Sequence, residues 1–190
     1  NDWCPTQEQF ANTSATEQFF SGQGAMFFAG SWDLANLCST YTDMNGKWDV
    51  AVLPKCPNPE SGDGRAVISN SVSYATAAEG KNKDTAMDFL KFLASEEGQR
   101  IQGESGVAIP AYNGLEDTWV NTFAENGYDI HPENIIPMFD YSVKYVNNPS
   151  RPSWEPKVEQ AVLDIYAGNM SVDDGIQNMQ DIVTEAIAEE

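Results

Sequence analysis

The feature that most restricts the fold of this chain is a short apolar run enclosed by two glycines. Residues 25–29 read AMFFA, and Gly24 and Gly30 stand on either side of them. A compact apolar run with turn residues at both ends is typical of a buried strand. After the turn, Ser31 can cap a helix that begins with Trp32. The run therefore predicts a strand, a turn and a helix, with Trp32 at the turn.

Helical patterns fill much of the remaining sequence. Ser14 and Glu17 form a capping-box pair, and Gly168 follows an apolar stripe as a stop signal. Ser171 precedes the final apolar stripe, which carries two acidic residues in its first turn. Caps and periodicity together predict helices near residues 14–21, 32–37, 84–93, 95–103, 116–126, 155–167 and 171–187.

Extended segments are predicted between these helices. Besides residues 25–29, they are residues 48–53, residues 67–78 and a short segment that ends at Pro110. A loop rich in proline and glycine separates residues 48–53 from residues 67–78 and suits a crossing between two lobes. Since strands and helices alternate along the chain, the predicted fold class is α/β.

The charge balance excludes one class of partner. The 190 residues include 10 Lys and Arg against 29 Asp and Glu, which gives a formal net charge of −19. Such a field repels phosphate backbones and anionic lipid surfaces, so nucleic acid is not an expected partner. No stretch approaches the roughly 20 apolar residues of a membrane-spanning helix. The first residues also lack the basic and apolar regions of a secretion signal, so we expect either a cytoplasmic protein or a piece whose beginning lies elsewhere.

The cysteines and the single histidine show no metal-binding spacing. Cys4, Cys38 and Cys56 form no CxxC pair, and His131 has no neighbour at ligand spacing, so neither a metal nor a cofactor is predicted. In an oxidising compartment one disulfide can form, and Cys38 with Cys56 is the first pair to test. The GxSxG, HExxH and phosphate-binding glycine motifs are absent, which argues against an enzyme.

Several short motifs follow one another in a specific order. Residues 20–26 read FSGQGAM, and the triplet GSW follows at residues 30–32. Later motifs occupy residues 50–54, 82–93, 95–99 and 106–110. Each motif alone is common. Together, in this order and at these spacings, they resemble the family-1 extracellular solute-binding proteins, the maltose-binding-protein-like receptors of ABC sugar importers.

The resemblance implies a periplasmic-binding-protein-like fold with two lobes (type II), which closes on a ligand like a hinged clamp. This chain is then the C-terminal portion of that fold. Residues 1–54 are expected in the second lobe, residues 55–105 to cross over and complete the first (N-terminal) lobe, and residues 106–190 to form the helical part of the second lobe. The remainder of the N-terminal lobe, in the same or a separate chain, is an expected partner.

The same resemblance implies a function. A protein of this kind binds a carbohydrate, here an oligosaccharide, outside the cell and delivers it to the membrane permease of an ABC importer. It is expected to be a membrane-anchored lipoprotein or a periplasmic protein, with an anchor signal outside this chain. Two alternatives stay open. One is a glycan-binding or cell-surface adhesion protein on the same fold, and the less favoured one is an enzyme that acts on glycosides.

Trp32 is the leading candidate for a sugar contact. The apolar face of a pyranose ring stacks on an indole, while its hydroxyls bond to polar side chains. A turn tryptophan by itself is more often packed in a core, whereas the position of Trp32 in the family pattern favours a ligand contact. Asp33 can accept hydroxyl bonds, although the helix dipole also explains a carboxylate there. Trp154 stands where relatives carry a cleft aromatic, and packing on the lobe surface is its alternative.

Four further residues are weaker candidates for the same cleft. Tyr112 and Tyr141 could line it, with a core or surface role as the alternative for each. Arg65 and Asn70 are polar candidates on the crossing segment. Trp119 lies on a segment that packing explains better, so it is left out of the predicted site.

Overall fold

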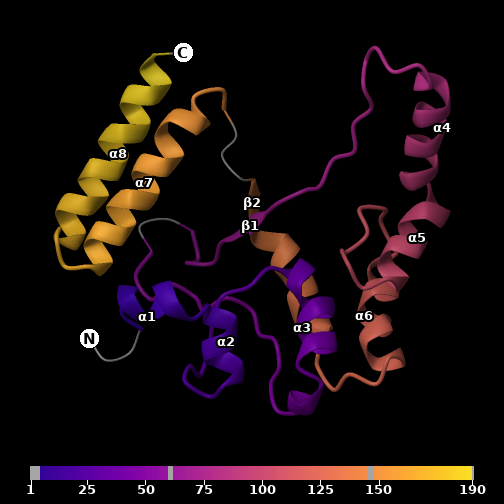
Figure 1. The fold of residues 1–190 in the computed structure, drawn as a ribbon, viewed down its shortest axis with the longest axis horizontal. Helices are drawn as coiled ribbons and strands as arrows, with labels where there is room; N and C mark the ends of the chain where they lie inside the picture. Colours follow the sequence, from indigo (N-terminus) through magenta and orange to yellow (C-terminus); the bar gives the residue numbers. More distant parts are fainter. Residues whose placement is uncertain (1–4, 60–61, 145–147, 190) are drawn as a thin grey trace. The chain divides into compact units, whose positions relative to one another are not determined.

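The computed structural model describes residues 5–59, 62–144 and 148–189 of the chain (Figure 1). These residues belong to two compact units. One comprises Asn1–Phe27 together with Val146–Glu190, and the other comprises Phe28–Tyr145. The predicted assignment of residues 1–54, 55–105 and 106–190 to two lobes stays a prediction.

Helices make up the first unit. Two short ones, α1 (Gln7–Asn12) and α2 (Ala15–Phe20), each begin with a capping box. In α2 the hydroxyl of Ser14 accepts a hydrogen bond from the Glu17 backbone, and the Glu17 carboxylate accepts one from the Ser14 backbone at 2.9 Å. The predicted capping pair is therefore confirmed, because both of its bonds are local to one turn of the chain.

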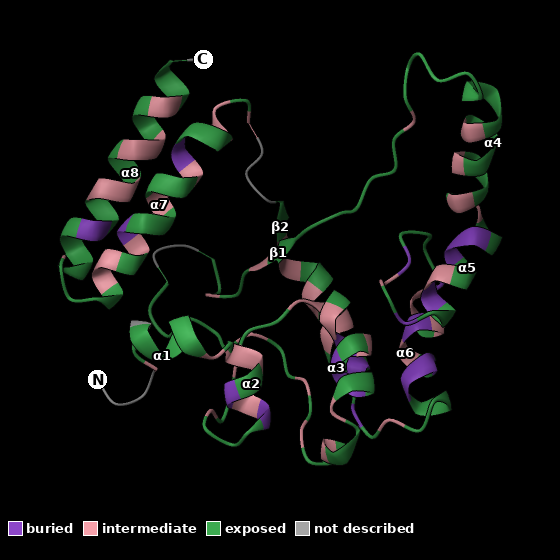
Figure 2. Ribbon diagram, in the orientation of Figure 1, coloured by how far each residue is buried: buried purple, intermediate pink, exposed green. Residues whose placement is uncertain are grey.

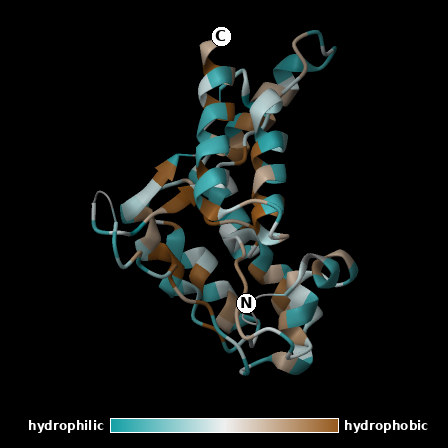
Figure 3. Ribbon diagram, turned by 90° about the vertical axis from the view of Figure 1, so that its left-hand side faces the viewer, coloured by the Kyte–Doolittle hydropathy of each residue, from teal (hydrophilic) through white to brown (hydrophobic). Residues whose placement is uncertain are grey.

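Two longer helices, α7 (Arg151–Tyr166) and α8 (Val172–Ala188), pack against each other in the same unit. Gly168 ends α7 with a φ of +76°, and Ser171 caps α8, as the sequence predicts. Gly175 of α8 lets the two helices approach closely, since a Cβ there would overlap Ile165. Figure 3 shows hydrophilic residues interspersed with hydrophobic ones along α8, as expected for a helix with one covered side.

The second unit contains short helices around two short strands. In chain order its elements are η1 (Ser31–Asp33), α3 (Leu34–Thr40), η2 (Thr42–Met44), β1 (Val67–Ser69), α4 (Lys83–Leu93), α5 (Glu96–Glu104), α6 (Glu116–Glu125), the 3-10 helix η3 (Pro132–Tyr141) and β2 (Ser142–Lys144). β1 and β2 pair in parallel, with Val67 opposite Ser142 and Ser69 opposite Lys144. This pair is the whole sheet within the residues that the structure describes.

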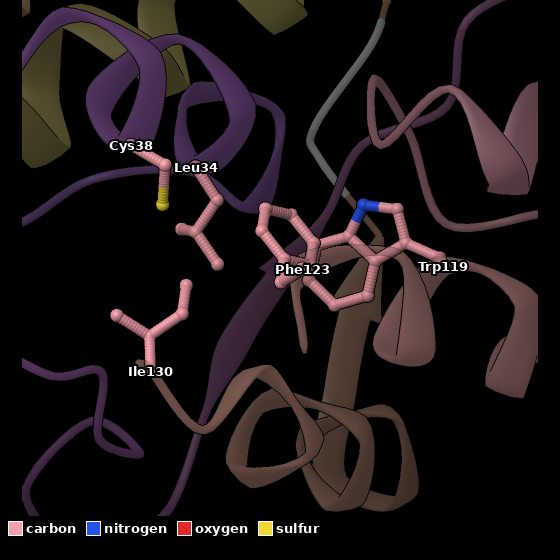
Figure 4. Packing of buried hydrophobic residues seen from close by; sticks show 5 residues of the cluster. All are labelled: Leu34, Cys38, Trp119, Phe123 and Ile130. Carbon is pink, nitrogen blue, oxygen red and sulfur yellow. The ribbon is translucent and has the colours of Figure 1, made fainter. Parts of the chain in front are cut away.

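The core of the second unit lies between α3 and α6. Its buried members are Leu34, Cys38, Trp119, Phe123 and Ile130 (Figure 4). The Trp119 and Phe123 rings meet edge to face with centroids 5.1 Å apart, and the indole N–H donates to the Gly106 carbonyl at 3.0 Å. The packing role expected for Trp119 is thus confirmed, with its one polar atom paired.

Several predicted strands are wrong. Residues 25–29, residues 48–53, most of residues 67–78 and the segment before Pro110 form no strand in the structure. Within the first of these segments, Met26 and Phe28 are exposed rather than buried. An apolar run becomes a strand only when a neighbouring strand bonds its backbone groups, and the described residues supply such a neighbour at β1 and β2 alone. The structure is therefore richer in helix and poorer in strand than the sequence predicts.

Cys38 and Cys56, the first pair to test for a disulfide, are not bonded to each other in the structure. Both thiols are free, Cys38 being buried and Cys56 exposed. The Cys38 sulfur lies in the apolar cluster beside Leu34 (Figure 4), and this burial raises the pKa of its thiol to about 11. Cys4 lies outside the described residues. Cys38 is therefore a core residue, with packing in place of redox chemistry.

Candidate functional site

Trp32 stands at η1, where the chain turns into α3. Its indole folds back over Gly30, so that a Cβ added to Gly30 would lie 2.5 Å from Cη2 of the ring. The Trp32 residue keeps 56% of its surface exposed. A side chain at residue 30 would therefore displace the ring from this position. The backbone thus supports the indole while leaving apolar ring surface accessible, which is the arrangement that a stacking contact needs.

Asp33 follows directly and is half-buried in the same 3-10 turn. Its backbone N–H donates to the Gly30 carbonyl at 3.0 Å, which closes the turn. The carboxylate makes no side-chain cap bond to α3. Trp32 and Asp33 therefore place an aromatic ring and an acceptor group on consecutive residues of one tight turn.

Arg65 and Tyr141 come together although 76 positions separate them in the sequence. The Arg65 guanidinium lies 4.9 Å from the centroid of the Tyr141 ring, a cation–π contact. The parallel register explains the meeting, because Arg65 precedes β1 by two residues and Tyr141 directly precedes β2. Nε of Arg65 also donates to Oδ2 of Asp63 at 2.7 Å, and this hydrogen bond lowers the pKa of Asp63.

Tyr112 and Asn70 are exposed, and nothing joins them to these groups. Tyr112 lies in the turn before α6, and Asn70 directly follows β1. Among the residues that the structure describes in this unit, no hydrogen bond or ring contact links either of them to Trp32, Arg65 or Tyr141. Their predicted role in a cleft stays a prediction.

Trp154 belongs to the other unit and is buried in the first turn of α7, with 8% of its surface exposed. Its indole N–H donates to Oδ1 of Asn148 at 3.1 Å. A buried ring with its polar atom paired favours the packing alternative over a stacking face. The helix also begins earlier than the sequence predicts, at Arg151, with Pro152 in its first turn, where no backbone donor is needed.

A hollow beside Trp154 was missed in the sequence. It measures about 450 Å³ and is lined by Asn148, Pro149, Arg151, Pro152 and Glu155. Nε and Nη2 of Arg151 donate to the two carboxylate oxygens of Glu155 at 3.0 and 2.7 Å. The sequence does place these opposite charges four residues apart, a spacing at which two side chains on one helix face can pair.

The described residues also bear on metal binding and on membrane crossing. No group of three or more His, Cys, Asp or Glu side chains there is placed to hold a metal ion. Within the same residues, no helix combines the length and apolarity that crossing a membrane requires. Trp32 and the Arg65–Tyr141 contact belong to the second unit, and the hollow beside α7 belongs to the first.

The comparison with protein families gives a match. The family model for bacterial extracellular solute-binding proteins matches residues 4–100, which is 97 of the 190 residues. Trp32, Asp33, Arg65 and Asn70 lie inside the matched stretch, whereas Tyr112, Tyr141 and Trp154 lie beyond it. A search of curated proteins finds no significant match.

Proposed function

This chain belongs to the family of bacterial extracellular solute-binding proteins, and we propose that it binds a carbohydrate and delivers it to the permease of an ABC importer. The observation that carries the carbohydrate class is the supported, accessible indole of Trp32. Sugars offer an apolar ring face and a rim of hydroxyls, and an aromatic surface beside polar groups complements both.

The unit that contains Trp32 also carries polar groups that can bind sugar hydroxyls. The Asp33 carboxylate can accept hydrogen bonds from hydroxyls next to a ring that stacks on Trp32. Arg65, held by Asp63, can donate to hydroxyls beside the Tyr141 ring. An oligosaccharide can use an aromatic face and several hydroxyl contacts at once, which favours it over a small ion.

The proposal includes a two-lobed (type II) fold outside the cell, in a lipid-anchored or periplasmic protein. Sugar binding is then the selective step, since closure of the lobes on the ligand distinguishes the loaded form from the empty one. Trp32 forms one wall of the cleft in this proposal. The opposite wall comes from an N-terminal lobe outside these 190 residues, so the isolated piece is expected to bind sugar weakly or not at all.

Calorimetry of the full-length protein against a panel of oligosaccharides tests the proposal. Trp32→Ala should weaken binding of the preferred sugar at least fivefold, because a lost aromatic contact costs on the order of 1 kcal/mol or more. Tyr166→Ala is the matched control, since Tyr166 is an exposed aromatic of α7 outside the proposed contacts. The Tyr166→Ala variant should bind the sugar with the affinity of the wild type.

Two results would count against this function. If a sugar binds tightly and Trp32→Ala changes its affinity by less than about threefold, Trp32 does not stack on the ligand. If new reducing ends appear during incubation with oligosaccharides, the protein is an enzyme rather than a receptor.

A further inference from the structure

Side chains, and not a strand ladder, fasten two segments of the second unit to each other. Asn45 begins the contact: its Nδ2 donates to the Gly127 carbonyl at 2.9 Å, and its Oδ1 accepts from the Asp129 backbone N–H at 2.8 Å. One amide thus bonds two backbone groups of a segment more than 80 positions away. Gly46, with a φ of +70°, keeps its backbone close to Asp129, where a Cβ would lie 3.0 Å from Oδ2.

The contact continues along both segments. Asp49 Oδ1 accepts from the His131 backbone N–H at 2.8 Å, and Asn134 Nδ2 donates to the Val50 carbonyl at 3.0 Å. Residues 45–50 therefore run along residues 127–134 through bonds between side chains and backbone. These bonds satisfy part of the backbone that the predicted strand at residues 48–53 would have paired.

One position in this contact can change its charge near neutral pH. Nδ1 of His131 lies 2.6 Å from Oδ2 of Asp49, so Asp49 holds both the backbone and the ring of the single histidine. We propose that the Asp49–His131 pair is a proton-operated clasp, which holds residues 45–50 on residues 127–134 more tightly when His131 is protonated. The inference is independent of the proposed function, because it concerns the free protein.

The charged groups around the His131 ring are acidic and favour its protonated form. The hydrogen bond and the negative charge of Asp49 raise the pKa of His131, with Glu133 and Asp129 adding to the effect and desolvation opposing it. Desolvation is the largest influence on Asp49 and acts upward, yet the bonds from the His131 and Val50 backbones and from the His131 ring outweigh it and lower the pKa. The ammonium group of Lys47, the nearest cation in the sequence, donates to the Asp43 carbonyl at 2.9 Å.

These directions set a pH window. The contribution of His131 is fully present below about 6.5, its usual pKa, and is lost as the pH rises through the raised value. The contribution of Asp49 is present above about 3.9 and is lost as the pH falls through the lowered value. The clasp is therefore strongest in mildly acidic solution. Above that window it loosens without opening, because a neutral imidazole with its proton on Nδ1 still donates to Asp49.

The clasp lies at the start of η3 and can stabilise that helix. His131 directly precedes η3, whose second-turn residues Ile135 and Ile136 pack against the buried cluster. The same helix ends at Tyr141, which lies beneath Arg65. Protonation of one imidazole thus acts at the start of the segment that carries Tyr141.

Hydrogen exchange of the full chain at pH 5.5 and pH 8.0, corrected for the intrinsic exchange rates, tests the clasp. Protection of the Asp129 and His131 amides should fall by about two- to threefold at the higher pH, the size expected for one exposed charge pair. In His131→Gln, which keeps a neutral donor, the two protections should agree. Glu125→Gln, which removes an exposed carboxylate that is not among the groups raising the His131 pKa, is the control and should keep the pH dependence of the wild type.

A second measurement reads the charge pair directly. In an NMR titration, Asp49→Asn should lower the pKa of His131 toward its usual value. Equal protection at both pH values in the wild type, a pH dependence that survives in His131→Gln, or a His131 pKa unchanged by Asp49→Asn would each overturn the clasp.

Discussion

Two helices of the second unit, α4 and α6, have similar lengths and similar amphipathic patterns, yet the apolar face is buried in α6 and largely exposed in α4. In α6 the Phe123 side chain is buried, with 1% of its surface exposed, and packs with Trp119 and the α3 residues. In α4 no residue is buried, and Phe89 leaves 58% of its surface exposed while stacking on Phe92. Figure 2 shows the contrast along the two helices.

The difference teaches what periodicity does and does not specify. The spacing of apolar residues fixes which face of a helix seeks cover. The spacing does not determine whether another element packs on that face. α6 lies against α5 and the buried cluster, whereas the apolar side chains of α4 find only partial cover from α5. Stability should therefore depend strongly on α6 and weakly on α4.

The largest expected effect comes from removing the ring at the centre of the core. Phe123→Ala should lower the free energy of unfolding by about 3–5 kcal/mol, because it leaves a cavity among residues that cannot fully collapse. Phe89→Ala is the matched control and should cost less than about 1 kcal/mol. Denaturant unfolding measures both, and similar losses in the two variants would contradict the comparison.

A smaller effect is expected where α5 meets α6. A Cβ added at Gly103 would overlap the Thr118 side chain and lie 2.9 Å from Cγ of Pro110. Gly103→Ala should therefore destabilise the protein by about 1–3 kcal/mol despite the better helix propensity of alanine. Thermal unfolding should show part of the loss restored in the double variant with Thr118→Ala. Absence of any loss in Gly103→Ala would show that α5 and α6 pack less tightly than described.

The smallest effect concerns the start of α5. Ser95 Oγ accepts from the Gly98 backbone N–H at 3.2 Å and donates to the Phe92 carbonyl at 2.7 Å. Ser95→Ala should cost about 1 kcal/mol of unfolding free energy. Asn82 precedes α4 and makes no side-chain cap bond, so Asn82→Ala should cost less when measured in the same way. If Asn82→Ala lost more unfolding free energy than Ser95→Ala, the start of α4 would be better capped than the start of α5, contrary to this prediction.

The candidate site shows the same division between what local pattern can and cannot predict. The turn that carries Trp32 was predicted, because Gly30 and Ser31 are adjacent to it in the sequence. The contact between Arg65 and Tyr141 had no local signal, since only the parallel register brings the two side chains together. The burial of Trp154 was hidden for a similar reason: its exposure depends on Asn148 and on the packing of a helix that starts earlier than predicted.

The sequence by itself determined the helix boundaries marked by Ser14, Ser95, Gly168 and Ser171, and the order of motifs that identifies the family. A cap or a turn bonds residues within a few positions, so its energy is local and its pattern can be seen in the chain. Only the tertiary structure decided which apolar runs are covered, which extended segments pair, and that Asn45, Asp49 and Asn134 join two segments through side chains. Those outcomes depend on partners far away in the sequence, and burial or pairing stabilises a segment only when such a partner is present.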